Sequence, residues 1–192
     1  MTETPRTRLK ITFSAVSAAC EIPMRIITPF LLATIMVSSA SGQTVQNPSC
    51  SDASFRQFDF WLGTWEVKDA SGKIAGSNTI RAQHQGCAIL EEWRSATGSA
   101  GSSINYYDPR TSRWKQIWIS PGALLEMSGG LQGQEMILEG PLQDLKQSRT
   151  TLLRGVWTPL PDGRVRQHFT ESKDGGKTWD EWFDGYYQRT RD

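Results

Sequence analysis

The chain has 192 residues, with 21 Lys and Arg against 20 Asp and Glu, and a formal net charge of +1. This length suits one domain, or one domain behind a leader. A charge so close to zero excludes the basic surface of a nucleic-acid-binding domain, and we expect no nucleic-acid partner. The unusual feature is the eight tryptophans, whose rings must pack in a core or around a ligand.

Residues 24–42 have the pattern of a secretory signal peptide. Arg25 supplies the positive start, an apolar run covers residues 26–37, and the small residues Ala40 and Gly42 offer cleavage points. The run is too short for a transmembrane helix. The pattern predicts a secreted or periplasmic bacterial protein, with no stable membrane span once the leader is removed.

Residues 1–23 lie ahead of this pattern. Either they are a mis-annotated start and Met24 is the initiator, or they form an extended n-region of the signal. A lipoprotein site at Cys20 is a third interpretation, although Ser17 stands where a leucine-like residue is usual. The remaining residues 43–192 keep every tryptophan and lose four basic and two acidic residues, which leaves a net charge of −1. We expect them to form a single domain.

Two cysteines remain after the leader, Cys50 and Cys87. An even number of cysteines in an exported chain favours a disulfide. The alternative is two separate thiols, because the sequence does not show whether the two Cα atoms come within bonding distance.

The mature chain has the pattern of an all-β domain. After a short helical turn over residues 53–57, segments rich in aromatic and β-branched residues alternate with turn signals. The glycine-rich residues 129–133 are interpreted as one of these turns. The expected strands are 58–68, 74–83, 87–95, 102–107, 113–120, 124–128, 135–139, 149–157, 164–171 and 178–189.

The links between these strands are short, which makes neighbouring strands antiparallel. A sequential antiparallel sheet loses its exposed edges by closing into a barrel. The pattern therefore predicts an up-and-down barrel of about eight to ten strands, lipocalin-like in form, with room for side chains or one small ligand. A two-sheet sandwich is the alternative.

Sequence motifs for catalysis are absent. The chain has no G-x-S-x-G, C-x-x-C, H-E-x-x-H or P-loop pattern. Its two histidines, His84 and His168, exclude a three-histidine zinc site, and the alternation around residue 168 places that histidine on an outer face. We assign no catalytic residue, metal or cofactor, and an enzyme is the less favoured interpretation.

Glu91 and Glu92 form the most informative polar pair. Adjacent strand residues face opposite ways, and Glu91 shares its face with Trp93. A buried carboxylate needs a partner, and Arg154, on one face with Val156, is the natural candidate. Such a pair could hold the polar head of a ligand or could be a closed structural salt bridge.

The strand at residues 113–120 places three large side chains on one face, and they complete the candidate ligand site. The aromatic residues could line a cavity or could simply fill the core. The candidate ligand-binding residues are Trp65, Glu91, Trp93, Trp114, Gln116, Trp118 and Arg154.

Residues 172–179 fit the Asp-box pattern S-x-D-x-G-x-T-W and resemble the hairpin turns of sialidase propellers. Asp174 can cap backbone amides, Gly176 can take a positive φ, and Trp179 can close the base of the turn. A glycosidase would carry several copies, whereas this chain has one. The motif is therefore interpreted as a structural staple.

The segment FDFWLGTW at residues 58–65 resembles the opening of a bacterial secreted protein family of unknown function. The resemblance continues through Trp114-x-Gln116-x-Trp118 and ends with DGGKTW running into FDGxY at residues 174–187. It implies a secreted calycin-like barrel and supplies no catalytic residue to transfer. The G-x-W opening is also similar to that of lipocalins and of nitrobindin-type haem barrels, for which His168 is a loose positional analogue only.

These features favour a secreted domain that binds a small, partly apolar ligand inside a barrel. One alternative is an enzyme of unknown reaction that uses Glu91, Glu92, Arg154 or His168. The other is a structural or protein-binding module of the cell envelope that uses exposed aromatic residues.

Overall fold

The computed structural model describes residues 50–190. The predictions on the leader, the start site and Cys20 lie outside these residues. Within the described part, no helix has the length and apolar character needed to cross a membrane.

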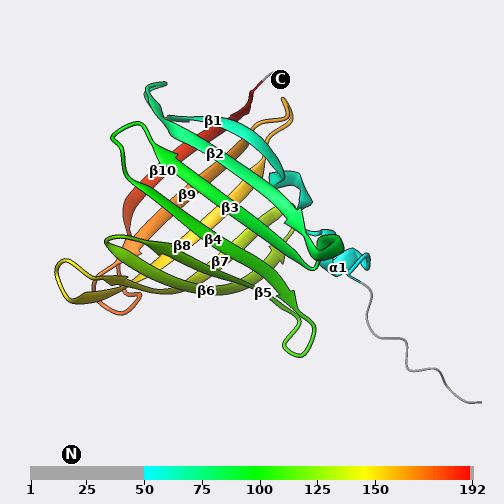
Figure 1. The fold of residues 1–192 in the computed structure, drawn as a ribbon. Helices are drawn as coiled ribbons and strands as arrows, with labels where there is room; N and C mark the ends of the chain where they lie inside the picture. Colours follow the sequence, from blue (N-terminus) through cyan, green and yellow to red (C-terminus); the bar gives the residue numbers. More distant parts are fainter. Residues whose placement is uncertain (1–49, 191–192) are drawn as a thin grey trace, which may run out of the picture. The chain divides into compact units, whose positions relative to one another are not determined.

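Ten antiparallel strands form a closed barrel (Figure 1). Each strand pairs with its neighbours in the sequence, and the first strand also pairs with the last. This closure confirms the predicted all-β barrel over the sandwich. The strands are β1 (Gly63–Asp69), β2 (Ile74–Gln83), β3 (Ala88–Ser95), β4 (Ala100–Asp108), β5 (Arg113–Ser120), β6 (Ala123–Gln132), β7 (Glu135–Asp144), β8 (Arg149–Pro159), β9 (Val165–Ser172) and β10 (Asp180–Arg189).

The first strand begins later than the sequence pattern predicts. Residues 58–61 do not extend; Asp59–Trp61 form the 3₁₀ helix η1, after the short helix α1 (Ala53–Arg56). The reason is packing, because Phe58 and Trp61 are both fully buried and three residues apart. A strand would send them to opposite faces, whereas one helical turn places them on the same side.

Only the last residue of the glycine-rich segment 129–133 belongs to a turn. Gly129 and Gly130 lie within β6, and the chain turns at residues 133–134. A Cβ added at Gly129 would collide with the carbonyl oxygen of Ile137 on β7. Glycine here permits a close approach of two backbones, which is a recognised role of glycine inside strands.

One end of the barrel is closed by residues 50–62, which we call the plug. The Phe58 ring stacks on Trp61 with centroids 5.0 Å apart, and it meets the rings of Trp114 and Trp157 edge-on at 5.6 and 5.3 Å. The indole Nε1 of Trp65 donates to the carbonyl of Trp61 over 3.0 Å. This aromatic cluster fills the barrel interior at the plug end.

A disulfide holds the plug in place. Cys50 and Cys87 are bonded with their Cα atoms 4.9 Å apart, so the predicted bridge is confirmed. Cys87 follows the 3₁₀ helix η2 (His84–Gly86) between β2 and β3. Arg56 adds a second link, because its guanidinium donates to the carbonyl of Gly86 over 2.6 Å.

We expect a Cys50→Ser, Cys87→Ser double variant to lose about 4 kcal/mol of unfolding free energy, because the bridge restricts a loop of 37 residues in the unfolded chain. Urea unfolding followed by tryptophan fluorescence measures the loss. Dithiothreitol should destabilise the wild type to a similar degree and leave the double variant unchanged. Equal stability of wild type and variant without reductant would contradict the structural role of the bridge.

Candidate functional site

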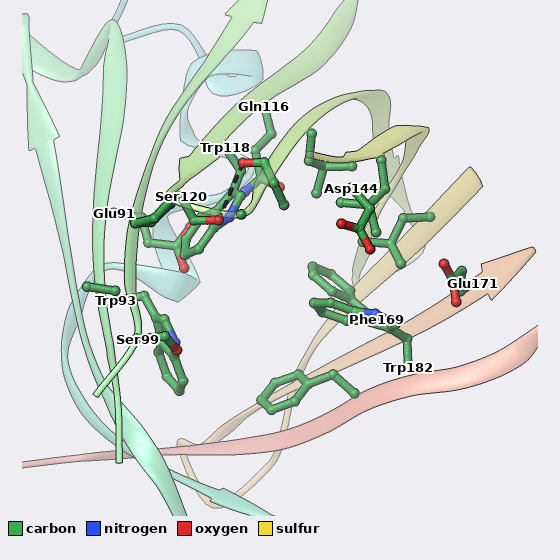
Figure 2. A pocket seen from close by; sticks show the side chains of 18 of the residues that line it. Glu91, Trp93, Ser99, Gln116, Trp118, Ser120, Asp144, Phe169, Glu171 and Trp182 are labelled. Carbon is green, nitrogen blue, oxygen red and sulfur yellow. Dashed lines mark hydrogen bonds between the residues drawn. The ribbon is translucent and has the colours of Figure 1, made fainter. Parts of the chain in front are cut away.

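The end of the barrel opposite the plug contains a cavity of about 750 Å³. Strands β3, β5, β7 and β9 run toward this end, and the turns that follow them surround it. Residues of these turns, including Ser99, Pro121 and Lys146, line the cavity entrance, which we call the mouth. Figure 2 shows Trp93, Trp118, Phe169 and Trp182 among the residues around the space.

The cavity wall is mainly apolar. Aromatic rings contribute much of the wall, and aliphatic side chains from β6, β7 and β8 complete it. The apolar wall residues include Trp93, Trp118, Ala123, Leu125, Leu142, Leu153, Phe169, Trp182 and Phe183.

Glycines on neighbouring strands explain why these large rings leave space between them. A Cβ added at Gly76 would lie 2.8 Å from the Trp93 ring, and one at Gly101 would collide with the Trp118 ring. The ring of Phe169 covers Gly155 on β8 in the same way. Each ring therefore lies over bare backbone, which moves it toward the barrel wall and keeps the interior open.

Polar side chains meet on the inner side of the cavity, away from the mouth. We call this group the floor; it consists of Glu91, Gln116, Gln167 and Tyr187, on β3, β5, β9 and β10. Figure 2 shows Glu91 and Gln116 on the side of the pocket away from Glu171.

Glu91 is the centre of the floor, and its side chain is buried. Its Oε1 accepts a hydrogen bond from Asn78 Nδ2 over 2.7 Å, and its Oε2 accepts one from Ser103 Oγ over 2.6 Å. The Asn78 amide also donates to the Tyr187 hydroxyl over 3.2 Å, and that hydroxyl donates to Gln167. Five strands are thus joined through one polar network.

Burial raises the pKa of Glu91 to about 7, although the hydrogen bonds from Ser103 and Asn78 act in the opposite direction. Burial, and secondarily the charge of Glu91, also raises the pKa of Tyr187 well above its usual value. Near neutral pH the Glu91 carboxyl therefore exchanges between its charged and neutral forms, while Tyr187 keeps its proton.

Charged residues surround the mouth. Arg149 lies 3.6 Å from a carboxylate oxygen of Glu171, which also accepts a hydrogen bond from Thr151 over 2.8 Å. Asp144 accepts from the backbone N–H groups of the β7–β8 turn at residues 146 and 147. The acidic Asp144 and Glu171 are balanced in number by the basic Lys146 and Arg149, so the mouth presents no excess of either charge.

The structure brings four of the predicted ligand-site residues to the cavity and places three elsewhere. Glu91, Trp93, Gln116 and Trp118 line it. Trp65 and Trp114 are fully buried in the core cluster at the plug end, where Gln57 accepts from the Trp114 indole over 3.1 Å.

The prediction that Arg154 pairs with Glu91 is wrong. Arg154 lies on the outer face of β8, where its Nε donates to Glu139 over 2.8 Å and its guanidinium stacks 4.1 Å from the centroid of the Trp179 ring. Both faces of β8 carry apolar residues, and the inward set is Leu153, Gly155 and Trp157. Apolar neighbours at positions 152 and 156 were therefore a misleading guide to the inner face.

Other residues that line the cavity were not predicted from the sequence. Gln167 and Phe169 point inward from β9, and Phe183 and Tyr187 do so from β10. The alternation in β9 could have identified Gln167, since the same alternation correctly places His168 outside, 3.3 Å from Glu181.

The Asp-box segment has the geometry of a turn staple. Asp174 accepts hydrogen bonds from the backbone of Lys177 and Thr178 and from the Ser172 and Thr178 hydroxyls. These bonds, those from Thr178 above all, lower the pKa of Asp174 to about 2. The carboxylate is fully engaged in holding the β9–β10 turn.

Among residues 50–190, no group of three or more His, Cys, Asp or Glu side chains is placed to hold a metal ion. Comparison with known protein families finds no matching family model, and a search of curated proteins finds no match. The family resemblance of the FDFWLGTW opening therefore stays a prediction.

The raised pKa of Glu91 predicts a pH-dependent stability. The folded state binds the Glu91 proton more tightly than the unfolded state, so this contribution is full below about pH 4.5 and is lost as pH rises through about 7. Between pH 5 and pH 8 we expect a loss of about 2 kcal/mol of unfolding free energy from this group. Urea unfolding at both pH values measures it.

Glu91→Gln should remove this component of the pH dependence. Glu92→Gln is the matched control, because Glu92 is the next residue on β3 but points outward and is exposed beside Arg81. Its pH dependence should equal that of the wild type. Parallel pH profiles of the wild type and Glu91→Gln would contradict the assignment.

Proposed function

We propose that this protein is a secreted or periplasmic lipocalin-like domain that binds a small, partly apolar molecule inside its barrel. The observation that carries the proposal is the cavity of about 750 Å³ at the end opposite the plug. Its size is in the range of sites for drug-sized ligands. An apolar wall over a small number of polar floor groups is the usual composition of such sites.

The division of the interior supports binding over simple core packing. At the plug end, Phe58, Trp61, Trp114 and Trp157 fill the barrel. At the other end, comparable rings lie over glycines and leave the centre empty. The aromatic cluster fills the plug end by itself. The space at the other end is therefore not needed for core packing and is available for a ligand.

The export of the protein is supported by two independent features. The signal-peptide pattern at residues 24–42 predicts secretion. The disulfide between Cys50 and Cys87 is typical of proteins that fold in an oxidising compartment.

Titration with the neutral apolar fluorophore N-phenyl-1-naphthylamine tests the proposal. We expect enhanced fluorescence with one probe per chain, and native mass spectrometry of freshly purified protein should reveal any ligand carried through purification. Ala123→Phe should weaken probe binding about tenfold or more, because Ala123 lines the cavity and a phenyl ring would occupy part of it.

Leu124→Phe is the matched control for this substitution. Leu124 is adjacent on β6 and points to the outer face, so its enlargement should leave the probe affinity unchanged. A wild-type protein that carries no ligand and binds no probe would overturn the proposed function. Equal weakening by both variants would show that the probe binds outside the cavity.

A further inference from the structure

The charges that line the cavity are unevenly placed. Four of the five charged lining residues, Asp144, Lys146, Arg149 and Glu171, belong to the mouth, where both signs are present. The fifth is Glu91, on the floor. Any charge on the floor of the cavity is therefore negative.

The hydrogen bonds around Glu91 are all directed toward its carboxylate. Gln116 Nε2 donates to Asn105 Oδ1 over 2.8 Å, Asn105 Nδ2 donates to Ser103 Oγ over 2.9 Å, and Ser103 Oγ donates to Glu91. Asn78 donates to its other oxygen. With both oxygens accepting, Glu91 is the final acceptor of the network, an arrangement that favours the anion.

This anion has no counter-ion inside the barrel. Within the described part of the chain, no Lys, Arg or His side chain forms an ion pair with Glu91, and its partners are the neutral Asn78 and Ser103. The Oδ1 of Asn78, beside it, is buried without a hydrogen-bond partner among these residues. Burying a carboxylate without a nearby cation costs free energy. The floor therefore lacks a positive group to offset the charge of Glu91.

The wall above the floor suits a cation as well as an apolar body. Trp93 lies two residues after Glu91 on the same face of β3, and its ring meets Phe183 edge-on with centroids 6.4 Å apart. Trp118 lines the cavity from β5. Aromatic faces attract cations, and Trp does so most strongly.

From the unpaired floor carboxylate, the donors directed at it and the aromatic wall, we propose that the ligand is an organic cation, a protonated amine with an apolar body, whose ammonium group contacts Glu91. This inference rests on the proposed function and specifies the ligand of the same cavity. An ammonium supplies the missing positive charge and up to three N–H donors, while the apolar body contacts Leu125, Leu142 and Leu153.

The position of Glu91 sets the length of the ligand. It lies four residues before the end of β3 at Ser95, or about 13 Å along the strand at the usual rise per residue. Strand tilt in a barrel reduces this to a depth of roughly 10 Å. An alkyl chain of about ten carbons spans that depth.

Three probes with the same chain and different heads test the inference: n-decylamine, 1-decanol and decanoate, titrated into the purified full-length protein at pH 8 by calorimetry. We expect decylamine to bind about tenfold or more tightly than decanol, because a charge-assisted contact with Glu91 adds to the same apolar contacts. Decanoate should bind more weakly than decanol, since it places a second anion beside Glu91.

Two variants locate the effect. Glu91→Gln should remove the preference for decylamine over decanol. Glu92→Gln, outward on the same strand, should retain it. If Glu91→Gln does not fold, the wild type supplies the same test through pH: decylamine affinity should fall several-fold from pH 8 to pH 5.5, as Glu91 takes up a proton. Tyr187 is the titratable group that faces Glu91 from β10, and it stays protonated over this range. The mouth groups Asp144, Lys146, Arg149 and Glu171 carry both signs, and decanol reports any change of the cavity itself with pH.

The outcomes separate the inference from the proposed function. Equal affinity for decylamine and decanol, or a preference for decanoate, would overturn the amine inference and leave the binding function in place. A preference for decylamine that persists in Glu91→Gln would place the amine elsewhere and also overturn it. Failure of all three probes and of the naphthylamine fluorophore would overturn the binding function itself.

Discussion

The pairing of β1 with β10 is the interaction on which the rest of the structure depends. Five residue pairs, from Trp65 opposite Arg189 to Asp69 opposite Gly185, join the first strand to the last. This pairing leaves no free edge in the sheet and forces every second residue of ten strands into one closed interior. The size of this interior is fixed by the closed sheet. The cavity is the part of it that the inward side chains leave unfilled.

The interior is shared unequally between the two ends of the barrel. At one end the plug adds the rings of Phe58 and Trp61 to those of the strands, and the disulfide from Cys50 to Cys87 anchors it. At the other end no segment of the described chain enters the barrel, and glycines beneath the aromatic rings widen the space. Glu91 lies between the two halves, where it is shielded from water yet borders the cavity. That position explains its raised pKa.

The strand pattern was largely predictable because alternation is a local property. The ranges 74–83 and 113–120 agree with β2 and β5. Glu91 and Trp93, expected on one face of their strand, both line the cavity, as do Gln116 and Trp118. Two segments were misjudged where a distant contact decided the backbone. Residues 58–61 form a helical turn because the rings of Phe58 and Trp61 must reach the same core. Gly129 stays in an extended strand because β7 approaches its backbone closely.

By itself, the sequence determined the all-β class, the antiparallel order and the residues that share a face, since these depend on period-two alternation and short links. Only the tertiary structure decided which rings fill the barrel and which surround a cavity. It also decided that Glu91 is held by Asn78 and Ser103 rather than by Arg154, which lies outside with Glu139. The physical reason is that strand alternation defines two faces without saying which is inside when both are partly apolar. That choice is made by closure of the sheet and by the limited volume it encloses.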